Sequence, residues 1–226
     1  FHEIRVSFTF FTDRLGGYSQ GDFSSLNLAQ HVNDDASAVL RNRELIAQQH
    51  GPTMYMNQVH GNTVEVVVEH SDLSPTCDAL VTTVPGITLA VMTADCIPLL
   101  LSSNNVIAAV HVGRRGLVNG VAGKTVQVMR DLGATSITAN LGPSICGTCY
   151  EVDQKTFDEV VTGFALARSQ SARGTLALDL AKALVAELQE LSIDSTCDSR
   201  CTFEDANLFS YRKSHRTGRQ AGLIRL

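Results

Sequence analysis

Two histidines and one cysteine combine residue types that can bind a transition metal. His60, Cys96 and His111 each lie beside an apolar run and next to a turn or a break in the pattern. Imidazole and thiolate together suit zinc, and three protein ligands leave a fourth tetrahedral position for water or substrate, which is typical of catalytic zinc sites. The spacings form no motif, so two core histidines and a buried thiol remain an equally good interpretation of these residues alone.

A single acidic residue, Asp95, directly precedes the cysteine of this trio. Apolar stretches flank it, and a carboxylate in such surroundings needs a partner. Asp95 could orient a ligand histidine or act as a general acid or base, and the competing role is to cap a nearby turn. We favour a role at the site and take Cys96 and Asp95 as candidate catalytic residues.

The segment that follows His111 contains two glycines and two arginines before a helical pattern begins. Arginines beside the amides at the start of a helix can hold a phosphate group. Gly113, Arg114 and Arg115 are therefore candidate phosphate-binding residues. A tight strand-to-helix turn with solvated arginines explains the same segment equally well.

Four of the six cysteines form two close pairs, Cys146-x-x-Cys149 and Cys197-x-x-x-Cys201. Paired thiols at short spacing can make a tetrahedral structural zinc site. Buried thiols without a metal are the simpler interpretation, and Cys77 has no obvious partner. A disulfide scaffold is not expected, because a chain of this length can build its own core.

The composition narrows the class of protein. The chain has 226 residues with 44% hydrophobic content, enough for one large core. Its formal net charge of -5 provides no field that would gather nucleic acid or anionic lipid. No apolar run approaches the roughly 18 to 20 residues of a membrane span, and the charged first residues lack a secretory signal. We expect a cytoplasmic protein with no nucleic-acid or membrane partner, and the sequence leaves open whether it forms a homo-oligomer.

Apolar periodicity predicts strands and helices in alternation. Asp34 or Asp35 can cap a helix over 36–50, which Gly51 would end by adopting a left-handed conformation. The almost wholly apolar runs 87–93, 97–102 and 106–111 predict strands that are covered on both faces. The other predicted strands are 3–9, 54–60, 63–69 and 223–226, and the other predicted helices are 117–132, 153–166 and 177–191. This alternation favours a mixed α/β sandwich over separable domains.

Seven stretches of the chain, in order from about Phe8 to the C-terminus, carry a resemblance to a known family. They are DRLGGYSQGDFSSLNL, NRELI, QVHGNTV, ADCIPLLL, AAVHVGRRGL, LGPSICGTCYEV and CTFEDANLFSYRKSHRTGRQAG. Together they resemble the YfiH-like family, formerly labelled multicopper polyphenol oxidoreductase or laccase-domain proteins. The resemblance implies one YfiH-like domain over 1–226 of the α+β class, a mixed β-sheet sandwich flanked by helices in an α/β/β/α arrangement.

The resemblance also implies a function. It implies one catalytic zinc ion bound by His60, Cys96 and His111, with copper the less favoured metal. It implies purine nucleoside phosphorylase activity with inorganic phosphate on adenosine, inosine, guanosine and methylthioadenosine, and adenosine deaminase activity in the same site. Both reactions suit a metal, which can activate water for attack on the purine or stabilise charge on a departing base.

Further site residues are weaker candidates. Arg43 resembles an arginine near the substrate in the family and is therefore the third candidate catalytic residue, although as an isolated feature it would be a surface helix residue. Arg212, Gln58 and Asn27 are additional candidates for substrate binding. Arg114 departs from the family pattern, which usually has an aromatic residue there. Of the second cysteine group, the resemblance covers Cys149 and Cys201, whereas Cys146 and Cys197 look like additions.

Three rival functions remain open. A cysteine hydrolase would use Cys96 as nucleophile and His111 or His60 as base. The resemblance to YfiH-like proteins implies that such an enzyme would be an amidase that edits peptidoglycan precursors. A multicopper polyphenol oxidase would need His-x-His pairs, and the seven histidines form none. A single copper centre with Met92 as a weak axial ligand remains formally available. The third alternative is a binding or regulatory protein with a vestigial site.

Overall fold

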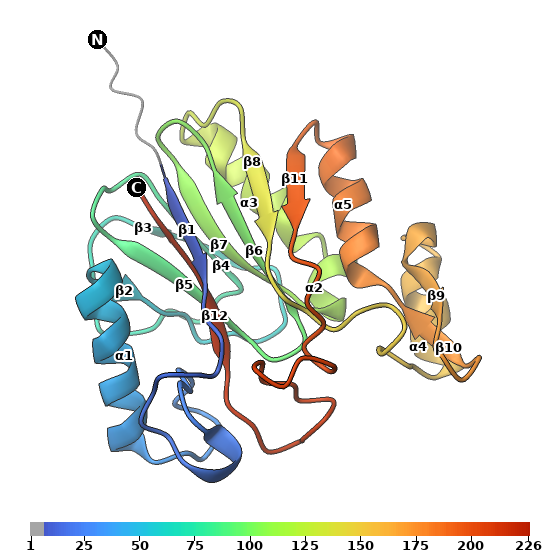
Figure 1. Cartoon of the computed structure of the whole chain (residues 1–226). Coiled ribbons are helices and arrows are strands. Elements are labelled where there is room, and N and C mark those ends of the chain that lie inside the picture. Colours follow the sequence, from blue (N-terminus) through green and yellow to red (C-terminus); the bar gives the residue numbers. More distant parts are fainter. Residues whose placement is uncertain (1–6) are drawn as a thin grey trace.

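The computed structural model describes residues 7–226, whose strands form two large sheets and one hairpin (Figure 1). The four-stranded sheet has the order β1 (Phe8–Phe11), β12 (Gln220–Arg225), β5 (Thr88–Thr93) and β2 (Thr53–Met54). The six-stranded sheet has the order β11 (Asp194–Cys197), β8 (Thr138–Leu141), β6 (Ile97–Ser102), β7 (Ile107–Val112), β4 (Ala79–Thr82) and β3 (Val64–Val67). The hairpin pairs β9 (Arg168–Gln170) with β10 (Leu176–Leu178).

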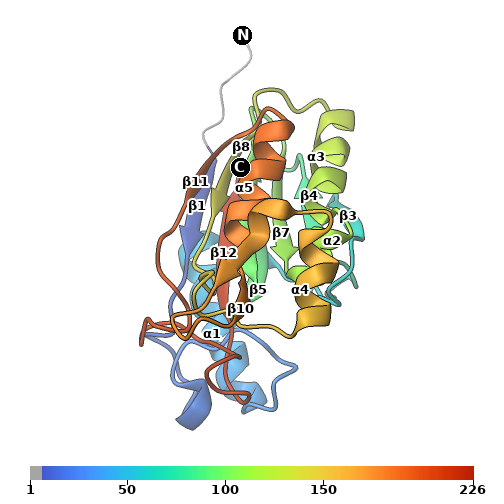
Figure 2. The ribbon, with the colours of Figure 1, turned by 90° about the vertical axis from the view of Figure 1, so that its right-hand side faces the viewer.

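Helices cover the outer faces of the two sheets. α1 (Ala36–His50) packs on the four-stranded sheet, and α2 (Arg114–Val118), α3 (Val121–Asp131) and α5 (Leu180–Glu190) pack on the six-stranded sheet. α4 (Gln154–Val161) packs on the hairpin instead, and two short 3-10 helices are η1 (Gly21–Phe23) and η2 (Ala165–Ala167). Figure 2 shows α3 and α5 on the side of the six-stranded sheet that faces away from β1 and β12. No helix among residues 7–226 combines the length and apolar character needed to cross a lipid bilayer.

Three apolar clusters hold these layers together. Side chains such as Leu89 of β5 and Leu100 of β6 pack between the two sheets. Met129 of α3 belongs to the cluster between the six-stranded sheet and its helices, and Ile46 of α1 packs with Ala90 on the opposite side of the molecule. The resulting α/β/β/α sandwich confirms the predicted fold class.

The predicted helix over 36–50 is confirmed at both ends. The Asp35 side chain accepts a hydrogen bond from the amide of Ala38, which satisfies one of the free N–H groups at the helix start. Gly51 follows the last helical residue with a φ of 87°, a conformation that glycine adopts without steric cost. Here local sequence alone determines the element.

Several predicted boundaries were wrong. The helix expected over 117–132 is broken into α2 and α3 by Gly120, whose φ of 70° is left-handed. The strand expected over 54–60 ends at Met54, and the helix expected over 153–166 ends at Val161. Residues 177–178 belong to β10, so α5 begins only at Leu180. Of the strand expected over 3–9, residues 3–6 lie outside the described residues.

Candidate metal centre

His60, Cys96 and His111 meet in space although they are far apart in sequence. One potential ligand atom from each lies within 4.8 Å of the other two, and we call this group the His-Cys-His cluster. The Sγ atom of Cys96 is 3.9 Å from Nε2 of His60. The two imidazole rings approach edge to face, with centroids 4.7 Å apart. The cluster can therefore hold one metal ion.

Strand register brings Cys96 and His111 together. β6 and β7 are antiparallel neighbours, and Pro98 at the start of β6 pairs with His111 near the end of β7. Cys96 lies just before β6 and thus beside His111. His60 reaches the same edge from the loop after β2, where Gln58 exchanges two hydrogen bonds with the backbone of Met92, at 2.7 and 2.9 Å.

A buried carboxylate that sequence reasoning missed, Asp78, positions both histidines. Its Oδ1 lies 2.8 Å from Nδ1 of His111 and accepts a hydrogen bond of 2.9 Å from the amide of His60. Its Oδ2 accepts a hydrogen bond of 2.7 Å from the amide of Gly61. Asp78 is fully buried, and His111 is 3% exposed. The contact at Nδ1 leaves Nε2 of His111 available as a ligand atom.

The electrostatics of the cluster favour a thiolate. Burial alone would raise the pKa of Cys96, but the charge of His111 and hydrogen bonds from both imidazoles outweigh burial and lower this pKa below its ordinary value. Burial alone would lower the pKa of His111, but Cys96 and Asp78 outweigh burial and raise it. Without a metal, Cys96 and His111 are thus biased towards a thiolate and imidazolium pair, and the thiolate is the form that binds metals.

The backbone at Gly113 leaves room for an ion. A Cβ atom at this position would lie 2.9 Å from Sγ of Cys96 and 3.1 Å from Cδ2 of His60. Real Cβ contacts are longer than this, so any other residue would press against the ligand side chains. The donor set and this clearance both fit a bound metal.

The His-Cys-His cluster lies on the wall of a cavity of about 900 Å³. Small-molecule pockets typically measure about 300 to 1,000 Å³. The cavity is lined by His31, Gln58, His60, Met92, Thr93, Ala94, Asp95, Cys96, His111, Arg114, Ile145, Tyr150, Leu180, Tyr211, Arg212, His215 and Arg219. Polar and aromatic side chains therefore surround the metal ligands.

Asp95 lines the cavity, but its carboxylate is bound to a neighbouring loop rather than to a ligand histidine. Oδ1 accepts a hydrogen bond of 2.6 Å from the hydroxyl of Thr202, and Oδ2 accepts one of 2.6 Å from the amide of Arg212. The backbone of Asp95 has a φ of 105°, which non-glycine residues rarely adopt. The geometry thus gives Asp95 a role in holding the wall of the cavity.

The arginines predicted to contact the substrate differ in position. Arg114 lines the cavity and forms an ion pair of 2.8 Å with Glu159, whereas Arg115 is exposed and does not line it. Arg212 lines the cavity, and its guanidinium donates a hydrogen bond of 2.6 Å to the carbonyl of Glu151. Arg43 lies behind the wall, over the ring of Tyr55 at 3.9 Å.

Asn27 is fully buried and supports the C-terminal loop instead of facing the cavity. Its Oδ1 accepts hydrogen bonds from the amides of Ala29, at 3.0 Å, and Arg219, at 2.9 Å. It therefore fixes the backbone of Arg219, a cavity residue that the sequence did not single out. Tyr150 and His31 are two further lining residues that sequence reasoning missed.

A second group of ligand-type side chains contains three of the four paired cysteines. Cys146, Cys149, Cys201 and Glu204 offer atoms within 4.8 Å of one another, and we call this group the three-cysteine cluster. Cys197 is exposed and lies outside it, so the structure separates the two members of the predicted Cys197 and Cys201 pair.

Comparisons with known proteins agree over nearly the whole chain. A family model described as multi-copper polyphenol oxidoreductase laccase matches residues 8–226. A purine nucleoside phosphorylase of Corynebacterium glutamicum is 42% identical, over 95% of this chain and 92% of that protein. A purine nucleoside phosphorylase of Streptomyces coelicolor is 44% identical, over 95% of this chain and 93% of that protein.

Solved structures match as well. A Neisseria meningitidis protein of family DUF152 superposes with a TM-score of 0.89 at 38% identity, covering 97% of this chain and 94% of that chain. The Bacillus licheniformis protein YfiH superposes with a TM-score of 0.89 at 27% identity, covering 97% of this chain and 92% of that chain.

Proposed function

This chain belongs to the family described as multi-copper polyphenol oxidoreductase laccase, and from that premise we propose that it is a zinc-dependent purine nucleoside phosphorylase. The proposed substrates are inorganic phosphate with adenosine, inosine, guanosine or methylthioadenosine, and the same site would deaminate adenosine. The observation that carries the proposal is the meeting of His60, Cys96 and His111 on the wall of a cavity large enough to hold a nucleoside and phosphate. The names of the similar proteins from Corynebacterium glutamicum and Streptomyces coelicolor support the phosphorylase part of this proposal.

The donor set supports zinc as the metal. One thiolate and two imidazoles suit zinc, and three protein ligands leave one position open. When bound, the ion supplies a Lewis acid that stabilises negative charge on an oxygen or nitrogen placed against it. A multicopper centre would need more imidazoles, and the metal-binding groups found among residues 7–226 contain only the two of the His-Cys-His cluster.

The charge of the cavity supports phosphate binding. Among the lining residues, Asp95 is the one carboxylate, and both of its oxygens already accept hydrogen bonds. Burial lowers the pKa of Arg219, an effect that Cys96 and Asp95 partly offset, and a guanidinium nevertheless stays charged at neutral pH. A partly desolvated arginine next to the cluster favours an anionic partner. We therefore place phosphate near Arg219 and Arg212, and not at the exposed Arg115.

The remaining wall suits a purine. Tyr150, Tyr211, Ile145 and Leu180 contribute aromatic and apolar surface. Burial raises the pKa of Tyr150, so its phenol stays protonated and can donate a hydrogen bond to the base. In phosphorolysis, a phosphate oxygen attacks C1′ of the ribose, the bond from C1′ to N9 breaks, and the electron pair leaves with the base, which then takes up a proton.

The test is the phosphate dependence of inosine cleavage. We expect release of hypoxanthine and ribose 1-phosphate only when inorganic phosphate is present. Arg219→Met should raise the KM for phosphate at least about tenfold, because it removes a charged contact. The matched control is Arg200→Met, since that guanidinium pairs with Asp198 and does not line the cavity. Hypoxanthine release at an equal rate in phosphate-free buffer would overturn the phosphorylase assignment.

One observation keeps a cysteine hydrolase as the second candidate. The bias of Cys96 and His111 towards a thiolate and imidazolium pair is also what a nucleophilic cysteine needs. Chelation separates the two functions. A phosphorylase with the proposed centre loses activity when the metal is removed and is restored by zinc, whereas a metal-free cysteine hydrolase keeps its activity and is inactivated by thiol alkylation.

A further inference from the structure

The three-cysteine cluster is built from two tight turns that face each other. In the first turn, the carbonyl of Cys146 accepts hydrogen bonds of 3.1 Å from the amides of Cys149 and Tyr150. In the second, the carbonyl of Cys201 accepts hydrogen bonds from the amides of Glu204, at 3.1 Å, and Asp205, at 2.9 Å. Each turn thus presents two ligand-type side chains three residues apart, Cys-x-x-Cys on one side and Cys-x-x-Glu on the other.

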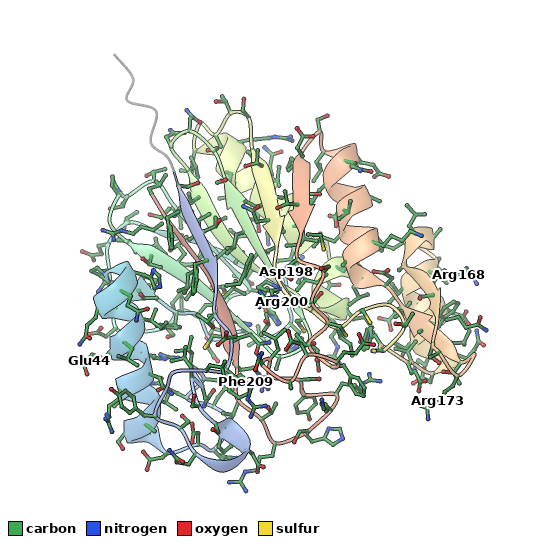
Figure 3. All side chains as sticks on the ribbon, viewed as in Figure 1. Glu44, Arg168, Arg173, Asp198, Arg200 and Phe209 are labelled. Atoms are coloured by element: carbon green, nitrogen blue, oxygen red, sulfur yellow. The ribbon has the colours of Figure 1, made fainter. Side chains whose placement is uncertain are left out.

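Backbone contacts fix the two turns against each other. Ser144 and Cys201 form an isolated parallel bridge, and the amide of Thr202 donates a hydrogen bond of 3.1 Å to the carbonyl of Ser144. The amide of Cys146 donates one of 3.3 Å to Sγ of Cys201. Asp198 and Arg200, whose ion pair of 2.6 Å precedes the second turn, are labelled in Figure 3 near the centre of the molecule. The four side chains are therefore held together by the fold itself.

The distances between the ligand atoms of the three-cysteine cluster are close to those in the coordination sphere of a single ion. Sγ of Cys149 lies 3.4 Å from a carboxylate oxygen of Glu204, and all four ligand atoms lie within 4.8 Å of one another. Ligands at about 2.0 to 2.3 Å from a tetrahedral ion lie about 3.3 to 3.8 Å apart, so a shift of about 1 Å or less closes the widest of these gaps. All three cysteines have free thiols, and Cys201 is only 6% exposed.

We propose that Cys146, Cys149, Cys201 and Glu204 bind a second, structural zinc ion. Three thiolates select a soft or borderline metal, and the carboxylate completes a four-coordinate, closed shell. The proposal of this site does not rest on the proposed enzymatic function, because the two groups share no ligand. It leaves no open position for a substrate.

The second ion connects the two loops that form one wall of the cavity. The first turn leads directly to Tyr150, which lines the cavity, and the amide of Ile145 donates a hydrogen bond of 3.0 Å to the carbonyl of Asp95. The second turn contains Thr202, whose hydroxyl binds the carboxylate of Asp95. A metal that joins both turns therefore stabilises the part of the wall that holds Asp95, next to the ligand Cys96.

The experiment is a zinc count per chain on purified, reduced protein and on four variants. We expect two zinc ions in the wild type, one in Cys96→Ala, and one in the double variant Cys146→Ser with Cys149→Ser. Cys197→Ser is the matched control, because this exposed thiol lies outside the cluster, and it should retain two. The fourth variant, Glu204→Gln, is expected to fold and to release one zinc to a chelator at least about tenfold faster than the wild type.

Two further measurements keep the proposal falsifiable if the double variant does not fold. Cobalt added to metal-free Cys96→Ala should give the intense thiolate-to-metal absorption of a site with three sulfur ligands. The midpoint of thermal unfolding of Cys96→Ala should fall by about 5 °C or more when its remaining metal is removed. A wild type with a single zinc that Cys96→Ala loses would overturn the second site and leave the first intact. A disulfide between Cys146 and Cys149 in the freshly purified protein, detected by mass, would overturn it too.

Discussion

The His-Cys-His cluster and the three-cysteine cluster use similar donor atoms but differ in their supports. The first takes three ligands from three separate segments at the edge of two sheets, and a buried carboxylate, Asp78, holds two of them. The second takes four ligands from two facing turns whose own backbone hydrogen bonds set the geometry. A site with three ligands on a cavity wall can accept a substrate, whereas a site with four ligands is complete. Ligand number and placement, more than ligand type, distinguish a reactive centre from a structural one.

The largest expected effect comes from removing the one thiolate of the His-Cys-His cluster. Cys96→Ala should lose this metal and reduce nucleoside phosphorolysis by at least about 1,000-fold, since a metal ion contributes several kcal/mol of charge stabilisation. Turnover and metal content of the purified variant measure this. If Cys96→Ala kept both its full zinc content and its activity, the His-Cys-His cluster would not be the reactive centre.

A smaller effect is expected from the buried carboxylate. Asp78→Asn should weaken zinc binding at the His-Cys-His cluster by about 10- to 100-fold, because the amide orients His111 less well and cannot accept hydrogen bonds at both of its positions. Competition with a chelator of known affinity measures this loss. Asp95→Asn is the contrasting variant, since Asp95 contacts neither histidine, and its zinc affinity should stay within about threefold of the wild type. Equal losses in the two variants would remove the special role given to Asp78.

The smallest effect is a pH dependence that differs between the clusters. His111, whose pKa is raised in the metal-free protein, must lose a proton before Nε2 can bind the ion. Zinc affinity at this cluster should therefore rise by up to about tenfold per pH unit between the lowered pKa of Cys96 and the raised pKa of His111, and become constant above the latter. Titration calorimetry in buffers of different ionisation enthalpy counts the protons released. Zinc binding should release more protons at the three-cysteine cluster, measured in Cys96→Ala, than at the His-Cys-His cluster, because three thiols must ionise. Equal numbers of protons released at the two clusters would contradict the assigned ligand sets.

The sequence predicted best what depends on neighbouring residues. The helix α1 was predicted with both ends, because Asp35 and Gly51 act within a single turn of the chain. The two central strands β6 and β7, buried except for Ser102 at the end of β6, were also predicted. The prediction gave both boundaries of β6 and those of β7 to within one residue, since their apolar runs are continuous. Gly120 broke the expected long helix, because its left-handed conformation depends on how α2 and α3 pack and not on apolar spacing.

The site was predictable only in part, because its residues converge through tertiary structure. The types and spacing of His60, Cys96 and His111 fit both a metal site and ordinary core residues, and only the family resemblance favoured the metal site. Asp78 was missed although it is a carboxylate between buried apolar residues, the same signal that drew attention to Asp95. In the second cluster, sequence proximity selected Cys197, whereas the turn after Cys201 brings Glu204 into place instead.

The position of β12 has a consequence for how the chain is made. This strand lies between β1 and β5, so the first described strand has no hydrogen-bonded neighbour until the last one is in place. Figure 3 labels Phe209, a fully buried residue on the segment that leads from the cavity wall into β12. On a ribosome, the backbone N–H and C=O groups of β1 therefore stay unpaired until β12 has been synthesised, and late closure of the sheet is what keeps this strand from pairing with other nascent chains.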